Sequence, residues 1–372
     1  MFITGTRADY GKMKSLMQIL DKDEQFEVFI FVCGMHLLKT YGNTYEEIIK
    51  DGYTNIHVAY GLLQSTDTSI NLGNTIAYLS GFVYSIVPDM IIVHGDRADA
   101  LAGAAVGAFH NIIVGHIEGG ELSGTVDESI RHAISKFAHA HFVCMEEAKA
   151  RLIQLGEEEE RIYVIGSPDV DIMLSNDLPG LQEVRKRYEI PFPEYGILMY
   201  HPVTTEYALL GERVKSVVDA VIDSGENYIV IYPNNDLGSE IILNEYRRLN
   251  DKERFKVFPS LRFEYFLTLL KYAKFIIGNS SAGIRESGIY GIPAIDIGTR
   301  QNERYNAEIM KNIMHTNENR DSILDAIRSI GIHAVKTQVF GDGNSTMRFY
   351  EIVKNDTFWK MEIQKKFVDF HE

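Results

Sequence analysis

Short apolar runs alternate with amphipathic stretches along nearly the whole chain, and this alternation restricts the fold more than any other feature. In the first half the apolar runs cover residues 2–4, 28–32, 90–94, 112–116, 141–144 and 162–165. Continuous apolar strands separated by helices are typical of a parallel sheet that is buried on both faces. The first half of the chain is therefore predicted to form a doubly wound α/β domain.

The same alternation starts again in the second half, at residues 196–200, 228–232, 255–258, 275–278 and 294–297. So many strands exceed what one twisted sheet holds comfortably, and 372 residues are enough for two or three domains. We therefore predict two Rossmann-like domains, residues 1–168 and 169–355, that face each other across a cleft. Residues 356–372 have an amphipathic pattern that predicts a C-terminal helix.

Charge and cysteine content argue against several classes of protein. The chain has 37 basic and 52 acidic residues, which gives a net charge of −15. Such a chain is a poor partner for nucleic acid or an anionic membrane, because both attract a basic face. Two cysteines make no disulfide framework, and neither a signal peptide nor an apolar span is recognisable. These features predict a cytoplasmic protein with no nucleic-acid or membrane partner.

The first predicted strand is followed by a glycine-bounded loop, Gly5–Lys12, that opens a helix. The loop differs from a P-loop, because five residues separate its glycines and Met13 follows the lysine where a serine or threonine is required. A turn that carries Arg7 and Lys12 at a helix N-terminus suits an anion. The alternative is a tight turn with two solvated cations.

Three carboxylates, Asp96, Glu118 and Asp127, come from strand-to-helix loops of the first predicted sheet. Carboxyl ends of parallel strands share one edge of a sheet, so these groups can converge there. Several carboxylates in one cleft raise each other's pKa and suit proton transfer. For Asp127 the alternative is plain capping of a helix whose N-cap is Thr125.

Two further patterns bear on metal binding and on anion binding. His139 and His141 would share one face of a strand, but a structural role fits them better than metal binding, and no metal site is predicted. In the second half, Ser280, Ser281 and Gly283 follow an apolar strand and form a predicted anion cradle, with Arg300 after the next strand. A serine N-cap without a ligand is the alternative there.

These motifs resemble those of the hydrolysing UDP-N-acetylglucosamine 2-epimerases of sialic acid biosynthesis. The matching stretches are residues 5–12, 94–97, 116–132, 200–206, 232–236, 259–267 and 278–286. The non-hydrolysing branch carries a proline-glutamate variant of the first loop and an alanine-glycine-leucine-arginine run after the catalytic glutamate. This chain has Arg7-Ala8-Asp9-Tyr10-Gly11 and Glu118-Gly119-Gly120-Glu121 instead, which is similar to the hydrolysing branch.

The resemblance implies a glycosyltransferase-B-like fold in which the C-terminal helix packs back on the first domain. It implies that UDP-GlcNAc and water become ManNAc and UDP, without a cofactor, in a homodimer or higher homo-oligomer. Elimination of UDP would give 2-acetamidoglucal, and water would then add to the double bond while a proton returns to the opposite face of C2.

The resemblance also assigns roles to single residues. It implies catalytic roles for Asp96, Glu118, Asp127 and His201. It implies substrate-binding roles for Arg7, Lys12, Arg97, Arg131, Asn234, Ser280, Ser281, Gly283, Glu286 and Arg300. Among the three acidic residues, neither the motifs nor the resemblance decides which one removes the C2 proton and which one returns it.

Several alternatives stay open at this level. The same chemistry could act on UDP-diacetamido-bacillosamine or GDP-GlcNAc, which are precursors of legionaminic acid. A non-hydrolysing UDP-GlcNAc 2-epimerase, a glycosyltransferase of the same fold and a nucleotide-sugar sensor are the others.

Overall fold

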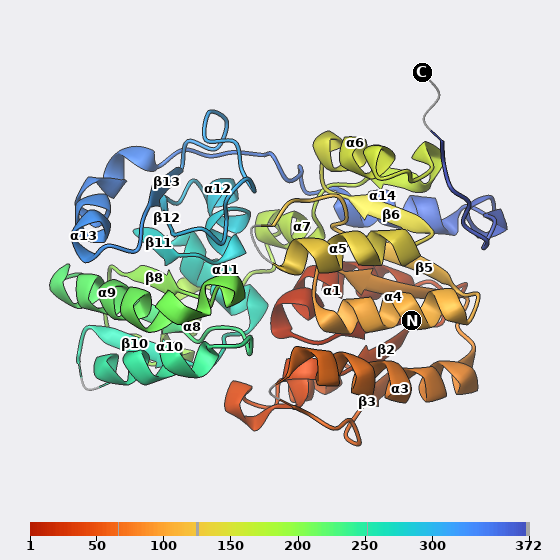
Figure 1. Cartoon of the computed structure of the whole chain (residues 1–372), viewed down its shortest axis with the longest axis horizontal. Helices are drawn as coiled ribbons and strands as arrows, with labels where there is room; N and C mark the ends of the chain where they lie inside the picture. Colours follow the sequence, from red (N-terminus) through yellow and green to blue (C-terminus); the bar gives the residue numbers. More distant parts are fainter. Residues whose placement is uncertain (66, 124–125, 251, 370–372) are drawn as a thin grey trace. The chain divides into compact units, whose positions relative to one another are not determined.

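A computed structural model of the chain describes residues 1–65, 67–123, 126–250 and 252–369. The chain divides into two compact units. Unit 1 consists of Met1–Glu121, Asp127–Ser175 and Val339–Glu372, and unit 2 consists of Leu122–Val126 and Asn176–Gln338. Figure 1 labels helices and strands of both units.

Unit 1 is built on a seven-stranded sheet in the order β3-β2-β1-β4-β5-β6-β7. Every neighbouring pair of its strands is parallel, which confirms the predicted doubly wound sheet. Its strands are β1 (Phe2–Thr4), β2 (Phe29–Val32), β3 (Asn55–Val58), β4 (Met90–His94), β5 (Ile113–Ile117), β6 (Ala140–Val143) and β7 (Ile162–Val164). Its helices are α1 (Arg7–Asp21), α2 (Tyr45–Lys50), α3 (Thr68–Ile86), α4 (Ala98–Phe109), α5 (Val126–Phe137), α6 (Glu146–Gln154), α7 (Pro168–Leu174) and α14 (Ser345–Lys354).

Successive strand residues point to opposite faces of this sheet, and both faces are buried. Phe2 and Ile92 pack with Leu16 of α1 and Phe349 of α14. The opposite face belongs to a second apolar cluster, which includes residues of α3, α4 and α5. These three helices lie side by side in Figure 1. This two-sided burial explains why the strands read as continuous apolar runs.

Unit 2 has a six-stranded parallel sheet in the order β10-β9-β8-β11-β12-β13. Its strands are β8 (Gly196–Met199), β9 (Tyr228–Ile231), β10 (Phe255–Phe258), β11 (Phe275–Gly278), β12 (Ala294–Ile297) and β13 (Ile313–Thr316). Its helices are α8 (Leu181–Arg187), α9 (Leu210–Asp223), α10 (Ser239–Tyr246), α11 (Phe263–Lys271), α12 (Glu286–Tyr290) and α13 (Arg320–Ser329). Short 3-10 turns cover residues 34–37, 39–41, 159–161, 204–209, 247–249, 281–283, 330–333 and 358–360.

Two details differ from the prediction: the end of the first domain and the position of the C-terminal helix. Unit 1 extends to Ser175 rather than to residue 168, because α7 buries Val170 and Met173 within this unit. The chain returns to unit 1 at Val339, and the helix that packs there is α14, not a helix over 356–372. Between 356 and 369 the described backbone is helical only in a 3-10 turn at residues 358–360, and residues 370–372 lie outside the described part.

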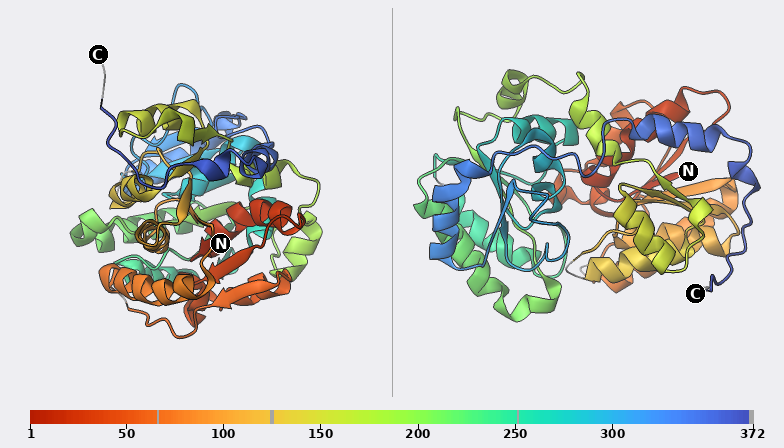
Figure 2. Two further views of the ribbon diagram at one scale, coloured as in Figure 1. Left: turned by 90° about the vertical axis from the view of Figure 1, so that its right-hand side faces the viewer. Right: turned by 90° about the horizontal axis from the view of Figure 1, so that it is seen from above.

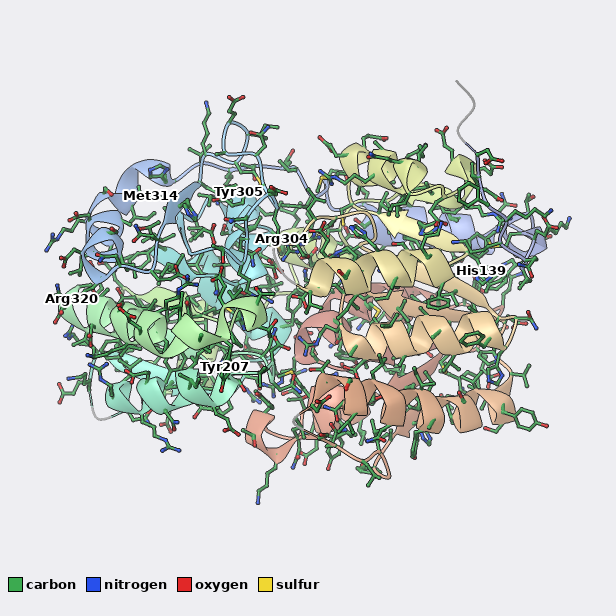
Figure 3. All side chains as sticks on the ribbon, viewed as in Figure 1. His139, Tyr207, Arg304, Tyr305, Met314 and Arg320 are labelled. Carbon is green, nitrogen blue, oxygen red and sulfur yellow. The ribbon has the colours of Figure 1, made fainter. Side chains whose placement is uncertain are left out.

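Figure 2 shows the segment after α14 in dark blue as mostly irregular chain. Polar contacts fasten this segment to unit 1 just beyond the end of α6. Its Lys365 pairs with the buried Glu157, which also accepts a hydrogen bond from His141 at 3.1 Å. His139, labelled in Figure 3, contacts the main-chain oxygen of Ile363 through Nε2 at 2.9 Å. Both histidines therefore have the structural role that the sequence favoured. Within the described ranges, no group of three or more His, Cys, Asp or Glu side chains is arranged so that it could hold a metal ion.

In the described part of the chain, no helix combines the length and the apolar character needed to cross a lipid bilayer.

Candidate active site

The loop after β1 is shaped by the carboxylate of Asp9 rather than left open for an anion. Asp9 accepts hydrogen bonds from the main-chain nitrogens of Gly5 and Thr6, both at 2.9 Å. Thr6 in turn caps α1 by accepting from the Asp9 nitrogen, so the two residues form a capping box. Arg7 forms a two-pronged ion pair with Glu47, with N–O distances of 2.5 and 3.0 Å. An anion at this loop would therefore meet side chains rather than a cradle of main-chain N–H groups.

Glu118 follows β5 in a backbone conformation that is rare for a residue with a side chain. Its φ angle is +64°, in the left-handed region, and only 4% of the residue is exposed. The strain is held by hydrogen bonds at both ends, because its nitrogen donates to Phe142 and its oxygen accepts from Arg131 at 2.6 Å. Strained residues that the surrounding structure holds in place cluster at functional sites. Glu118 is therefore the strongest single candidate for a reacting group in unit 1.

The carboxylate of Glu118 is surrounded by polar groups from three other elements. Ser167 donates to Oε1 at 3.0 Å, Nε2 of His94 lies 3.3 Å from the same oxygen, and Nζ of Lys12 lies 3.6 Å from it. Lys12 also lies 3.4 Å from the carboxylate of Asp169. Lys12, which the resemblance assigned to substrate binding, is thus placed as a buried counter-ion of two carboxylates.

Arg131 joins two of the loops that the sequence singled out. Its side chain, 2% exposed, forms an ion pair with Asp96 and also donates to the main-chain oxygen of Glu118. Asp127 lies one helical turn before Arg131 in α5, so the two side chains share one helix face. The structure therefore links Asp96 and Glu118 through Arg131, and Asp127 belongs to the helix that carries this arginine. Thr125, the predicted N-cap of α5, lies outside the described residues.

His116 supports the same loops from within the sheet. Burial lowers the pKa of His116 to about 3, so its ring is neutral at physiological pH. Its Nε2 lies 2.8 Å from the oxygen of Gly95, which can only accept, so Nε2 carries the proton. Its Nδ1 then accepts from Ser135 at 3.1 Å. This histidine ties the loop that bears Asp96 to α5 and has a structural role.

In unit 2, His201 is oriented so that one ring nitrogen is defined as a donor. Its Nδ1 accepts a hydrogen bond from the main-chain nitrogen of Asn234 at 3.0 Å, so in the neutral ring Nε2 carries the proton. The buried side chain of Asn279 bonds both the nitrogen and the oxygen of His201, at 2.6 and 2.9 Å. Asn234 thus acts on His201 through its backbone.

The loop after β11 combines a cap with a cationic side chain. The hydroxyl of Ser280 accepts from the nitrogen of Ala282 at 3.3 Å, which is the capping role weighed from the sequence. Ser281 and Gly283 form the 3-10 turn that follows. Arg300 donates to the oxygen of Asn279 at 3.2 Å, and Glu286 is 3% exposed at the start of α12.

The structure places Asp96 and Glu118 just after strands, as predicted, and Arg97 immediately precedes α4. Lys12 is not in a loop, because α1 already begins at Arg7 and Lys12 is a buried residue of this helix. The sequence reasoning assigned no site role to His94, Ser167, Asp169 or Asn279, although His94 and Asn279 lie at or just after strand ends. The same signal that selected Asp96, a polar residue after an apolar strand, would have selected them.

Comparison with known proteins adds an independent finding. Residues 18–354 match a family described as UDP-N-acetylglucosamine 2-epimerase. A UDP-N-acetylglucosamine 2-epimerase of Neisseria meningitidis serogroup B is 48% identical over 99% of this chain and 98% of its own length. A UDP-N,N'-diacetylbacillosamine 2-epimerase (hydrolyzing) of Legionella pneumophila is 34% identical over 95% of both chains.

Solved structures agree on the fold. The crystal structure of a UDP-GlcNAc 2-epimerase from Neisseria meningitidis bound to UDP-GlcNAc superposes with a TM-score of 0.79 at 17% identity, covering 95% of this chain and 99% of that one. Such a likeness supports the predicted glycosyltransferase-B-like class for the two parallel-sheet units.

Proposed function

Because the chain belongs to the UDP-N-acetylglucosamine 2-epimerase family, we propose that it is a hydrolysing enzyme that converts UDP-GlcNAc and water into ManNAc and UDP. The observation that carries this proposal is the 48% identity to the Neisseria meningitidis protein, which runs along nearly the whole of both chains. In sialic acid biosynthesis, to which the sequence resemblance points, ManNAc would be the product that is passed on.

Two observations support the hydrolysing branch over the branch that keeps the nucleotide attached. The Legionella pneumophila relative carries the word hydrolyzing in its name. The runs Arg7–Gly11 and Glu118–Glu121 are similar to those of hydrolysing enzymes and differ from the non-hydrolysing pattern.

The chemistry requires a base for the C2 proton after the C1–O bond to the diphosphate begins to break. Positive charge then develops at the sugar, and the C2 proton becomes acidic enough for a carboxylate. Glu118 offers a buried carboxylate with a fixed orientation, and Asp96 offers a second one, 21% exposed, held by Arg131. Two carboxylates in different environments suit removal of a proton on one face and its return on the other. Asp127 is the third candidate for this work.

The leaving diphosphate needs donors and positive charge, which side chains of unit 2 supply in this proposal. His201 presents its Nε2–H as a donor, and Arg300 and Ser281 supply a guanidinium and a hydroxyl. Within unit 1, Arg7 is a separate candidate cation for an anionic group of the substrate. Within unit 2, Glu286 suits the ribose hydroxyls as an acceptor. Arg97, Asn234, Ser280 and Gly283 complete the proposed substrate-binding set.

An NMR time course with UDP-GlcNAc in D₂O tests the proposal directly. Elimination and hydration should release ManNAc that carries deuterium at C2, together with UDP. Retention of protium at C2 would contradict the elimination step, and deuterated UDP-ManNAc would assign the chain to the non-hydrolysing branch. Release of GlcNAc would indicate simple hydrolysis.

The second candidate is the same reaction on another nucleotide sugar. The name of the Legionella pneumophila relative favours UDP-N,N'-diacetylbacillosamine as this alternative. Parallel assays with that donor, with GDP-GlcNAc and with UDP-GlcNAc compare kcat/KM directly. We expect the highest value with UDP-GlcNAc.

A further inference from the structure

Lys12 lies between two buried carboxylates in unit 1. One of them, Glu118, has a role in the proposed reaction, and the other, Asp169, has none so far. Its Nζ is 3.6 Å from Oε1 of Glu118 and 3.4 Å from Oδ2 of Asp169. The side chains of Lys12, Glu118 and Asp169 are 8%, 6% and 2% exposed. Buried charges are costly unless they are paired, so each member of this trio depends on the other two.

Three groups approach the same oxygen of Glu118. Ser167 donates to Oε1, and His94 and Lys12 lie within 3.3 and 3.6 Å of it. Contacts that converge on one oxygen fix the rotation of a carboxylate, because the second oxygen must then take a defined direction. The start of α7 contributes to this twice, through Ser167 and through the hold of Asp169 on Lys12.

The start of α7 is itself fixed by the returning C-terminal segment. The nitrogen of Ser167 donates to the oxygen of Phe340 at 2.7 Å. About one helical turn after Ser167, Asp171 accepts from the nitrogens of Ser345 and Thr346 at 2.9 and 2.6 Å, which caps α14. Ser167 and Asp169 are therefore held in place by a rigid element of unit 1 rather than by a free loop.

We propose that Asp169 is a positioning residue for Glu118, which acts by holding the Lys12 ammonium against Oε1 and by sharing its charge. In this proposal Asp169 acts through Lys12. It controls the orientation of Glu118 and the balance between its ionised and protonated forms. The inference rests on the proposed function for its catalytic consequence, whereas the charge arrangement can be tested without turnover.

The charges around Glu118 give opposite predictions for two substitutions. Among the described residues, the charged and titratable groups next to its carboxylate or its backbone include Lys12 from α1, His94 from β4 and Arg131 from α5, and Asp169 from α7 lies beside Lys12. Asp169→Asn removes a negative charge and leaves Lys12 to Glu118 alone, so Glu118 should ionise at lower pH. Lys12→Met leaves two acidic groups without their shared cation, so Glu118 should ionise at higher pH.

The first measurement follows the ¹³C signal of the Glu118 carboxyl group in protein labelled at glutamate, with Glu118→Gln identifying the signal. We expect the titration midpoint to move down by about one pH unit in Asp169→Asn and up by about 1–3 units in Lys12→Met. The double variant, which loses one charge of each sign, should lie between the two. Equal midpoints in wild type and Asp169→Asn, or shifts of the same sign in both single variants, would overturn the proposal.

Asp171→Asn is the matched control, because it places the same substitution two residues further along α7. Asp171 caps α14 through the nitrogens of Ser345 and Thr346, so its variant should lower the melting temperature and leave the Glu118 midpoint unchanged. A shift in this control as large as that in Asp169→Asn would mean that general loosening of α7 explains both, and the positioning role would be rejected.

Turnover supplies the second measurement. We expect Asp169→Asn to lower kcat by about 10- to 100-fold, the range for groups that support a reacting residue, while calorimetry shows UDP affinity within twofold of wild type. A variant that weakens UDP binding and keeps kcat would contradict the proposal. If wild-type protein does not turn over any of the tested nucleotide sugars, the proposed function fails, and the Glu118 titration still decides the charge arrangement.

Discussion

Removal of the Arg131 guanidinium should weaken unit 1 and the reaction together. Arg131 is 2% exposed, donates to the Glu118 oxygen at 2.6 Å and pairs with Asp96. A hydrogen bond to a charged donor contributes about 1.5–3 kcal/mol. Loss of one partner of a buried ion pair costs about 3–5 kcal/mol, and this must be reduced here because Asp96 is 21% exposed and can be hydrated. We therefore expect Arg131→Met to lower the free energy of unfolding by ~3 kcal/mol.

Arg131→Lys separates charge from geometry. A lysine keeps the positive charge, but its compact ammonium cannot reach both partners with the fork of a guanidinium. The free energy of unfolding should therefore fall by only ~1–2 kcal/mol, while kcat falls in both variants because the loops of Asp96 and Glu118 lose their link. The double variant with Asp96→Asn should show that the two losses are not additive.

Urea unfolding measures this loss in the correct part of the molecule. Trp359 is the single tryptophan of the chain and belongs to unit 1, so its fluorescence reports on that unit. The midpoint should shift while the slope with urea stays constant. If Arg131→Met unfolds at the wild-type urea concentration and only raises KM, Arg131 contacts substrate and the bridging role is wrong.

The other expected outcomes concern single groups. Glu118→Gln should lower kcat by ~10²–10⁴-fold with UDP binding retained, and turnover near the wild-type level would remove Glu118 from the reaction. Arg7→Ala should weaken UDP binding by ~1–3 kcal/mol in calorimetry, whereas Glu47→Gln, which frees Arg7 from its ion pair, should not weaken it. Burial alone would raise the pKa of Glu157, but the hydrogen bond from His141 and the nearby lysine ammoniums bring it to about 2. Its folded-state pKa lies below the unfolded value, so its stabilisation is present above about pH 4.5 and is lost toward pH 2; Glu157→Gln should flatten this part of the stability curve.

The strands buried within the sheets could be predicted from the sequence, and two strands at sheet edges could not. The runs 2–4, 90–94 and 275–278 coincide with β1, β4 and β11, because strands covered on both faces are continuously apolar. The missed strands are β3, with sequence Asn-Ile-His-Val, and β13, with Ile-Met-His-Thr. Both lie at the edge of a sheet, where half-buried positions admit polar residues and the apolar run is interrupted.

The site was predictable where chemistry follows a strand, and unpredictable where it depends on contacts between distant segments. The positions of Asp96 and Glu118 just after apolar strands could be predicted from the sequence, and their catalytic roles stay a prediction. Ser167 was interpreted only as part of a chain-breaking sequence, because nothing local indicates that its hydroxyl meets Glu118, 49 residues earlier. Spacing along the chain likewise cannot show that Lys12 pairs with Asp169.

The return of the chain to unit 1 determines when this unit can be completed during synthesis. Phe349, Val353 and Phe358 belong to the same apolar cluster as Phe2 and Phe142. The roughly 160 residues from Asn176 to Gln338 leave the ribosome before that last part, and their synthesis takes about 10–30 s at about 5–20 residues per second. During this time the nascent first unit keeps an uncovered apolar face, because the residues after Gln338 that cover it have not yet been made. A stalled or truncated chain that ends at Gln338 should therefore bind chaperones through its N-terminal half, and release should require the final thirty or so residues.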